Sequence, residues 1–271
     1  MDLSPQLFAI FAGLIEAECG LHYAPNDSDL LAAKLVAHAG EVGFDSLLDF
    51  YYRLRYDDPD GAAKRALIES LVVHETYFFR ELAPLRALVS EYLVPLLERR
   101  RARVWSAACS TGEEPFTLAM LLDERGVLDS VEIVATDISD AAIAKAKLGQ
   151  FGKRALRDGH PVELAQRYLD KTPRGITLAP RLRDAVNFAR VNLVDAARVS
   201  TLGTFDAILC RNVLIYMRDA QIARMLAQLE ASLAPRGVIA VGVSESLLRF
   251  GTALRCEERG GAFFYRRASD P

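Results

Sequence analysis

The sequence predicts an α/β protein in which a helical N-terminal region precedes a mostly parallel sheet covered by helices on both faces. Apolar residues recur at helical spacing through the first 73 residues, beginning with Phe8, Phe11, Leu14 and Ile15. After about residue 100, short apolar segments typical of strands alternate with helical segments. Such alternation with short connections favours a parallel sheet, because each helix returns the chain to the same edge.

The N-terminal region is expected to form a helical domain over residues 1–73. Leu30 to His38 continues the helical spacing, and Asn26-Asp27-Ser28 supplies capping side chains before it. Further helices are expected at 44–54 and 61–73, separated by the break Asp57-Asp58-Pro59-Asp60-Gly61.

The second domain is expected over residues 74–271. Its predicted strands are 104–107, 132–136, 186–191, 205–210 and 238–242, and its predicted helices are 114–125, 139–148 and 219–233. Pro235-Arg236-Gly237 reads as a break after the last helix, and 254–257 with 263–267 as a terminal hairpin. The stretch 150–185 does not fit this alternation and is interpreted as an insertion.

Composition excludes several classes of protein. Of 271 residues, 51% are apolar and 25% charged, which is typical of a soluble globular chain. The net charge of −3 gives no basic field for nucleic acid or lipid, and no apolar run is long enough for a membrane span. The N-terminus carries acids where a signal peptide carries bases. The four cysteines are scattered, without metal-ligand spacing, so we expect a cytoplasmic protein without a metal.

A candidate binding loop follows the first predicted strand. Cys109-Ser110-Thr111-Gly112-Glu113-Glu114 leads into a helix, and Asp137 ends the next strand 25 residues after Gly112. Small residues let a ligand approach the helix N-terminus, and an acid at the second position can bind ribose hydroxyls. The two glutamates would repel a pyrophosphate but attract a cationic nucleoside such as S-adenosylmethionine. Alternatively, Gly112 is only a tight turn and Asp137 a helix cap.

Two further segments carry polar residues in places where ligands bind. Arg211, Asn212 and Tyr216 follow an apolar strand ending at Cys210, and carboxyl ends of strands form the binding edge of open α/β sheets. His74-Glu75-Thr76-Tyr77-Phe78-Phe79-Arg80-Glu81 joins the two expected domains. The alternatives are that Tyr216 packs in the core, that Asn212 caps a helix, and that the 74–81 segment is a linking helix with a solvated Arg80.

Together these segments resemble the chemotaxis-receptor glutamate methyltransferases, the CheR family. The resemblance covers nearly the whole chain and is strongest in HETYFFRE (74–81), VWSAACSTGEEPFTLAM (104–120), ATDIS (135–139), VNL (191–193), CRNVLIY (210–216) and GVSES (242–246). It implies formation of glutamate methyl esters from S-adenosylmethionine by a class I methyltransferase (Rossmann-like) domain that follows a helical domain. It also implies a small β insertion within about residues 150–190. The implied partner is a chemotaxis receptor or a related signalling protein.

The resemblance also implies roles for individual residues. The expected cofactor contacts are His74, Thr76, Arg80, Glu113, Glu114, Asp137, Asn192, Leu193, Arg211 and Asn212. Thr76 and Arg80 would bind the methionine end, Asp137 the ribose, and Asn192 would lie by the adenine. Tyr216 would lie beside the sulfonium and, with Arg80, is the expected catalytic residue. The pattern does not decide which of Glu113 and Glu114 faces the ligand.

Two features depart from the family pattern. The family usually has Asn where this chain has His74, and a histidine changes charge between about pH 5 and 8. Family members also tend to carry basic N-terminal helices, whereas residues 1–73 here hold 12 acids and 5 bases, a net charge of −7. Arg53 and Arg55 remain as expected substrate contacts, with Lys64 and Arg65 as further candidates. The acidic domain favours an unusual or non-receptor acceptor, or a receptor with a more basic methylation region.

Other functions are weighed against this one. A non-catalytic module that senses S-adenosylmethionine would share the motifs. A nucleic-acid methyltransferase is disfavoured by the negative net charge and by Arg211-Asn212-Val213-Leu214, where amino-methylating DNA enzymes have an Asn/Asp-Pro-Pro-aromatic run. A dinucleotide oxidoreductase is disfavoured by the acidic loop with its single glycine.

Overall fold

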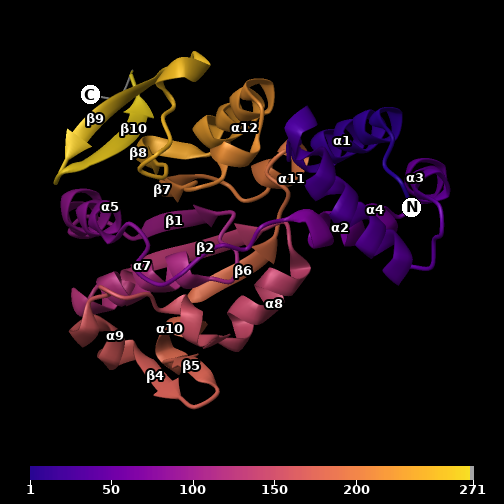
Figure 1. Ribbon diagram of the computed structural model, residues 1–271. Helices are drawn as coiled ribbons and strands as arrows, with labels where there is room; N and C mark the ends of the chain where they lie inside the picture. The colour runs from indigo at the N-terminus through magenta and orange to yellow at the C-terminus, as the bar shows by residue number, and fades with distance from the viewer. Residues whose placement is uncertain (269–271) are drawn as a thin grey trace. The chain divides into compact units, whose positions relative to one another are not determined.

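The computed structural model describes residues 1–268, which divide by their internal contacts into two compact units (Figure 1). The N-terminal unit comprises Met1–Val73 with Tyr216–Gln221, and the sheet unit comprises His74–Ile215 with the chain from Ile222 onward. Within residues 1–268, no helix has the length and apolarity needed to cross a bilayer.

Residues 1–73 of the N-terminal unit contain four α-helices: α1 (Pro5–Cys19), α2 (Ser28–Glu41), α3 (Leu47–Tyr56) and α4 (Ala62–Leu71). Their apolar faces meet in a core that includes Phe11, Leu35 and Phe50, all at most 1% exposed. The third helix begins three residues later than predicted, because the Ser46 hydroxyl accepts the Asp49 N–H and caps it there. Asp27 does not cap α2 through its side chain, which instead accepts the Ala24 N–H.

The sheet unit contains a seven-stranded sheet of order β6-β2-β1-β7-β8-β10-β9 (Figure 1). Its strands are β1 (Ala102–Ala107), β2 (Val131–Asp137), β6 (Val186–Arg190), β7 (Phe205–Leu209), β8 (Leu233–Ala240), β9 (Leu254–Arg259) and β10 (Ala262–Arg267). The first five run parallel, while β10 pairs antiparallel with both β8 and β9. The α/β class and the terminal hairpin are confirmed.

The helices that connect these strands begin and end close to the predicted positions. They are α7 (Glu113–Glu124), α8 (Asp140–Leu148) and α12 (Asp219–Ala231), whereas the short helix α11 (Ala196–Ser200) between β6 and β7 was not predicted. Ser139 caps α8 by accepting the Ala142 N–H. An unpredicted helical stretch precedes β1, formed by α5 (Leu82–Ala87), a π-helical turn (Leu88–Leu93) and α6 (Val94–Leu97).

Residues 150–185, interpreted from the sequence as an insertion, contain a second sheet. Its three antiparallel strands have the order β3-β5-β4: β3 (Gln150–Phe151), β5 (Gly175–Leu178) and β4 (Leu169–Thr172). The helices α9 (Val162–Tyr168) and α10 (Pro180–Asp184) accompany it, and Figure 1 shows this group gathered beyond β6.

The predicted break at Pro235-Arg236-Gly237 is wrong, because these residues lie within β8. The register between β7 and β8 shifts there: Phe205 pairs with Leu233, but Ala207 pairs with Val238. The extra residues form an irregularity in which Arg236 adopts a φ of 63°. Proline is tolerated in a strand at such a bulge, since it need not donate to the ladder.

Candidate active site

The carboxyl ends of the parallel strands bring the predicted site segments to one edge of the sheet unit. Residues 108–112 follow β1, 138–139 follow β2, 191–194 follow β6, 210–214 follow β7 and 241–245 follow β8. After β1 the chain continues to β2, which lies on one side of β1 in the sheet, whereas β7 lies on the other side of β1. Ligands of open α/β sheets bind at such a reversal of strand order.

Backbone strain is concentrated in these segments. Six non-glycine residues among 1–268 have positive φ, and five of them belong to the site segments or the 74–81 motif: Phe79, Glu81, Ala108, Ser110 and Asn212. Such conformations cost about 1–3 kcal/mol each and persist only where the surroundings hold them. Their clustering marks this edge as a functional site.

The loop after β1 requires glycine at position 112. Gly112 has a φ of +95°, and a Cβ there would lie 2.9 Å from both the Ala146 Cβ and the Phe116 Cε2. Neither contact can be relieved by moving a flexible side-chain end, because one atom is the methyl group of Ala146 and the other belongs to the buried ring of Phe116. The loop backbone therefore runs close to α7 and α8.

The carboxylate of Asp137 organises the ends of β1 and β2. Its Oδ2 accepts the Ser110 N–H at 2.7 Å and its Oδ1 accepts the Ser139 N–H at 3.0 Å. Burial raises the pKa of Asp137 above its usual value, although both hydrogen bonds and the charge of His74 act in the opposite direction. The Ser110 hydroxyl beside it is buried and has no hydrogen-bond partner among the described residues.

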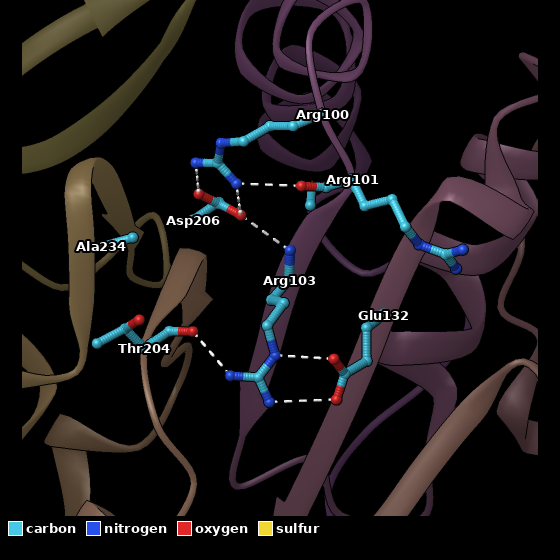
Figure 2. A pocket seen from close by; sticks show the side chains of 8 residues that line it. Arg100, Arg101, Arg103, Glu132, Thr204, Asp206 and Ala234 are labelled. Carbon is cyan, nitrogen blue, oxygen red and sulfur yellow. Dashed lines mark hydrogen bonds and ion pairs between the residues drawn. The ribbon is translucent and has the colours of Figure 1, made fainter.

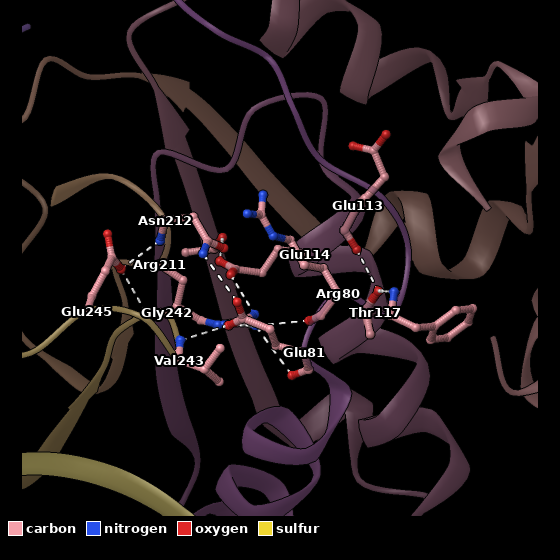
Figure 3. A network of polar contacts seen from close by, with 12 residues as sticks. Arg80, Glu81, Glu113, Glu114, Thr117, Arg211, Asn212, Gly242, Val243 and Glu245 are labelled. Carbon is pink, nitrogen blue, oxygen red and sulfur yellow. Dashed lines mark hydrogen bonds and ion pairs between the residues drawn. The ribbon is translucent and has the colours of Figure 1, made fainter. Parts of the chain in front are cut away.

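The two adjacent glutamates at the start of α7 have different surroundings. Glu113 is 3% exposed, and its Oε2 accepts the Thr111 hydroxyl at 2.6 Å. Burial raises the pKa of Glu113. In contrast, Glu114 accepts the Ser106 hydroxyl at 2.7 Å and pairs with Arg211 at 2.9 Å. Figure 3 shows the Glu113 side chain directed away from the contacts that Glu114 makes.

Arg211 is the centre of a buried ion-pair network (Figure 3). Its side chain is 2% exposed, and it bonds Glu114 through Nη1 and Glu81 through Nη2, both at 2.9 Å. Nη2 also donates to the Arg80 carbonyl at 2.9 Å. Burial of Glu81 acts to raise its pKa. The Arg211 charge and the hydrogen bonds from Asn212 and Val243 outweigh burial and hold the pKa of Glu81 below its ordinary value. The Arg211 guanidinium is thus engaged within the protein.

The 74–81 motif does not form a linking helix. Residues 72–77 have no regular structure, and 78–81 form a turn. The Phe78 N–H donates to the Ala155 carbonyl and the Phe79 N–H to the Thr117 hydroxyl, which fixes the motif against the sheet unit. Arg80 is half-buried, donates through Nη1 to the Glu75 carbonyl, and lies 5.7 Å from the Tyr77 ring. Thr76 is half-buried and His74 exposed.

The remaining predicted residues lie in two places. Asn192 and Leu193 are half-buried after β6, where the Val191 N–H donates to the Asp137 carbonyl. Tyr216 groups with the N-terminal unit, and its carbonyl accepts the His22 N–H at 2.8 Å. Arg53 and Arg55 lie on α3 of that unit, where Arg53 pairs with Asp57 at 3.5 Å and Arg55 is exposed.

Two structurally central carboxylates were not predicted. Glu81 contacts Arg211, Asn212 and Val243, and Glu245 accepts N–H groups of the 212–214 turn. Both lie inside quoted motifs, next to residues that were predicted. An acid within each polar motif was the available signal, but its partners are set by the fold.

The thiols at this edge are not nucleophiles. Cys109 and Cys210 are both buried, and burial raises the pKa of each thiol well above its ordinary value. A thiol with a raised pKa is protonated near neutral pH, and the thiolate is the reactive form. The site therefore offers carboxylates, amides and a guanidinium for binding rather than an activated cysteine.

The edge fits a cationic nucleoside such as S-adenosylmethionine. Gly112 lets the loop backbone pass close to Ala146 and Phe116, and the buried Ser110 hydroxyl has no hydrogen-bond partner among the described residues. Glu113 and Asp137 bury negative charge there, which favours a positively charged ligand at reduced dielectric.

A hollow of about 350 Å³ lies at the opposite, amino edge of the sheet (Figure 2). It is lined by residues that pair with one another: Arg100 bonds Asp206 through both Nη atoms, and Arg103 bonds Glu132 through Nε and Nη2. The Asp206 carboxylate also accepts the Arg103 N–H. These contacts join the starts of β1, β2 and β7, so we interpret the hollow as structural.

Comparison with known proteins shows the family to which the chain belongs. Residues 74–259 match the family model described as "CheR methyltransferase, SAM binding domain". Chemotaxis protein methyltransferase 1 of Pseudomonas aeruginosa is 34% identical over 251 residues, covering 89% of this chain and 90% of that protein. Chemotaxis protein methyltransferase Cher2 of Pseudomonas putida is 32% identical, with the same coverage.

A third relative is named for biofilm formation rather than for chemotaxis. The probable biofilm formation methyltransferase WspC of Pseudomonas putida is 34% identical over 248 residues, covering 90% of this chain and 57% of that protein. The family model covers most of the sheet unit, and the relatives extend the match across the N-terminal unit. This protein is therefore an S-adenosylmethionine-dependent methyltransferase of the CheR family.

Proposed function

We propose that the protein forms methyl esters on glutamate side chains of a chemoreceptor, or of a related signalling protein, in the cytoplasm. The observation that carries the proposal is the acidic, buried edge around Gly112, Glu113 and Asp137, in a chain whose residues 74–259 match the CheR family. The relatives named for chemotaxis and for biofilm formation support a signalling protein as acceptor.

The cofactor would be held by the segments that follow the strands. Asp137 retains lone pairs for ribose hydroxyls beyond its two backbone hydrogen bonds. Asn192 and Leu193 would contact the adenine, and Thr76 and Arg80 the methionine carboxylate. Because the Arg211 side chain is held by Glu81 and Glu114, its expected contribution comes from its backbone and from its hold on the motif.

The reaction needs no general base in this proposal. A glutamate side chain has an ordinary pKa of about 4.3 and is already ionised near neutral pH. When bound, S-adenosylmethionine supplies an activated methyl group. The protein's residues then act by holding the acceptor carboxylate in line and excluding water, and positioning alone can lower the barrier by about 7–11 kcal/mol.

Arg80 and Tyr216 are the residues we assign to positioning at the reacting groups. A guanidinium binds a carboxylate through two parallel hydrogen bonds and does not lose its proton in a protein. We therefore assign Arg80 to binding and orientation. The Tyr216 hydroxyl would orient the acceptor rather than accept a proton.

The acceptor protein would contact the N-terminal unit. Its net charge of −7 differs from the basic surface expected for contact with an acidic methylation helix. Arg55 is exposed on α3, and Arg53 beside it is partly occupied by Asp57. Charge complementarity sets partner choice and association rate more than affinity. We therefore propose an acceptor with a more basic methylation region than usual.

The test is transfer of labelled methyl to a panel of receptor cytoplasmic domains that differ in the charge of their methylation helices. We expect base-labile label on basic or neutral members, and loss of label with Arg80→Ala. The matched control is Arg86→Ala on α5, a position outside the site segments. Efficient labelling of an ordinary acidic member would contradict the acceptor proposal. Binding of the cofactor without transfer to any acceptor would favour a non-catalytic module.

A further inference from the structure

The carboxylate of Glu245 is bound almost entirely by backbone. Its Oε1 accepts the N–H groups of Val213 and Leu214 at 2.9 and 2.8 Å. Its Oε2 accepts those of Asn212 and Gly242, both at 2.7 Å. Four N–H groups from two strand ends thus converge on one half-buried side chain. Hydrogen bonds to an ionised acceptor are about twice as strong as neutral ones.

The turn held in this way begins in an unfavourable conformation. Asn212 has a φ of 59°, in the left-handed region, and three successive N–H groups from 212 to 214 point at the same carboxylate. These groups follow β7 and lie outside the ladder, so without Glu245 they lose their acceptor. The Glu245 carboxylate therefore supplies the hydrogen-bond acceptors that neither β7 nor the following 3₁₀ turn provides for these N–H groups.

A second carboxylate fixes the side chain of the same residue. The Asn212 Nδ2 donates to the Glu81 Oε1 at 3.2 Å, and the Val243 N–H donates to the Glu81 Oε2 at 3.1 Å. The amide nitrogen and the backbone N–H of Asn212 are both engaged. The amide oxygen is left as the group that can accept a hydrogen bond from a ligand.

Gly242 shows how closely these parts meet. A Cβ at this position would lie 2.6 Å from the Asn212 Nδ2 and 2.9 Å from the Glu245 Oε2. Gly242 has no positive φ, so an alanine there would act by contact rather than by backbone strain. The absence of a side chain at Gly242 therefore lets both Asn212 and Glu245 lie close to the end of β8.

We propose that Glu245 is a positioning residue of the cofactor site, which sets the place of Asn212 by clamping the 212–214 turn to the end of β8. The proposal rests on the assignment of Asn212 to the cofactor in the proposed function. Glu245 acts through the backbone and does not itself touch the cofactor.

The test compares Glu245→Gln with Glu258→Gln in the full-length protein. Glutamine keeps the shape of Glu245 but turns an NH₂ group toward two of the four N–H donors. Glu258 is an exposed carboxylate on the edge strand β9 and serves as the matched control. Gly242→Ala tests the same clamp from the other side, with Gly152→Ala as its control, because no atom lies within 4 Å of a Cβ there.

Three measurements are made at a temperature at which every variant is folded: hydrogen exchange of residues 210–217, the Kd for S-adenosylmethionine by calorimetry, and kcat for methyl transfer. We expect Glu245→Gln and Gly242→Ala to speed amide exchange in the turn, raise the Kd at least 10-fold and lower kcat. The two controls should stay within twofold of the wild type.

Unchanged exchange in the turn would overturn the proposal, because the clamp would then not hold it. Faster exchange with an unchanged Kd and kcat would also overturn it, by reducing Glu245 to a structural role. A wild type that binds the cofactor but transfers no methyl group would refute the proposed function instead. The exchange and Kd comparison would still decide the role of Glu245 in that case.

Discussion

Replacing Gly112 with alanine should destabilise the sheet unit and damage the cofactor site together. A residue other than glycine at a φ of +95° costs about 1–2 kcal/mol. The added Cβ also meets Ala146 and Phe116 at 2.9 Å, and overpacking a filled core costs about 1–3 kcal/mol. We therefore expect a loss of about 2–5 kcal/mol in the free energy of unfolding, or about 4–20 °C in Tm.

The matched control is Gly126→Ala, in the turn that follows α7. Gly126 has a φ of +68°, but no atom lies within 4 Å of a Cβ at this position. It therefore carries the conformational cost of about 1–2 kcal/mol without the crowding. Thermal unfolding followed by circular dichroism measures both variants, and calorimetry measures their affinity for S-adenosylmethionine. Equal Tm losses in the two variants, or full cofactor affinity in Gly112→Ala, would refute the reasoning.

Three further changes have expected outcomes. Because burial raises the pKa of Glu113, its ionised form costs stability at neutral pH; Glu113→Gln should raise the Tm of the ligand-free protein at pH 7. That gain should shrink as pH falls through the raised pKa and vanish below the ordinary value of 4.5, while cofactor affinity falls at pH 7. Asp206→Ala, at the amino edge, should cost about 2–4 kcal/mol in urea unfolding because Arg100 and the Arg103 N–H lose their acceptor, yet leave the cofactor Kd unchanged. His74→Asn should raise the pKa of Asp137 further, because the His74 charge is one of the causes that lower it; an unchanged Asp137 titration measured by NMR would exclude this role of the imidazole.

The strands of the large sheet could be predicted because burial on both faces demands continuous apolar sequence. β7 (Phe205–Leu209) is buried at every position, and its prediction was correct to within one residue. β8 was predicted too short, because Pro235 and Gly237 read as a turn. The local sequence does not distinguish a turn from a bulge at this place. A Cβ at Gly237 would lie 2.9 Å from the Phe205 carbonyl oxygen, and this contact arises only once β7 is in place beside β8.

The site was predictable in its segments but not in its connections. Gly112 and Asp137 follow strands, and a parallel sheet brings such positions together whatever the rest of the chain does. The pairing of Arg211 with Glu81 joins residues 130 positions apart, and spacing along the sequence carries no information about it. The expected cofactor contact of Arg211 stays a prediction, and nothing in the spacing indicated that two carboxylates hold its guanidinium.

The distribution of these acids follows from the chemistry proposed for the site. Glu81 and Glu114 share the single positive charge of Arg211, so each carboxylate of this network has a direct cationic partner. Glu113 and Asp137 are also buried, but their pKa values are raised, which means that the ligand-free fold does not fully compensate their charge. A cation at this edge would supply that compensation, and a neutral nucleoside would not. The same two carboxylates that destabilise the empty site can therefore favour a sulfonium over its uncharged product, so that binding energy is concentrated on the methyl donor.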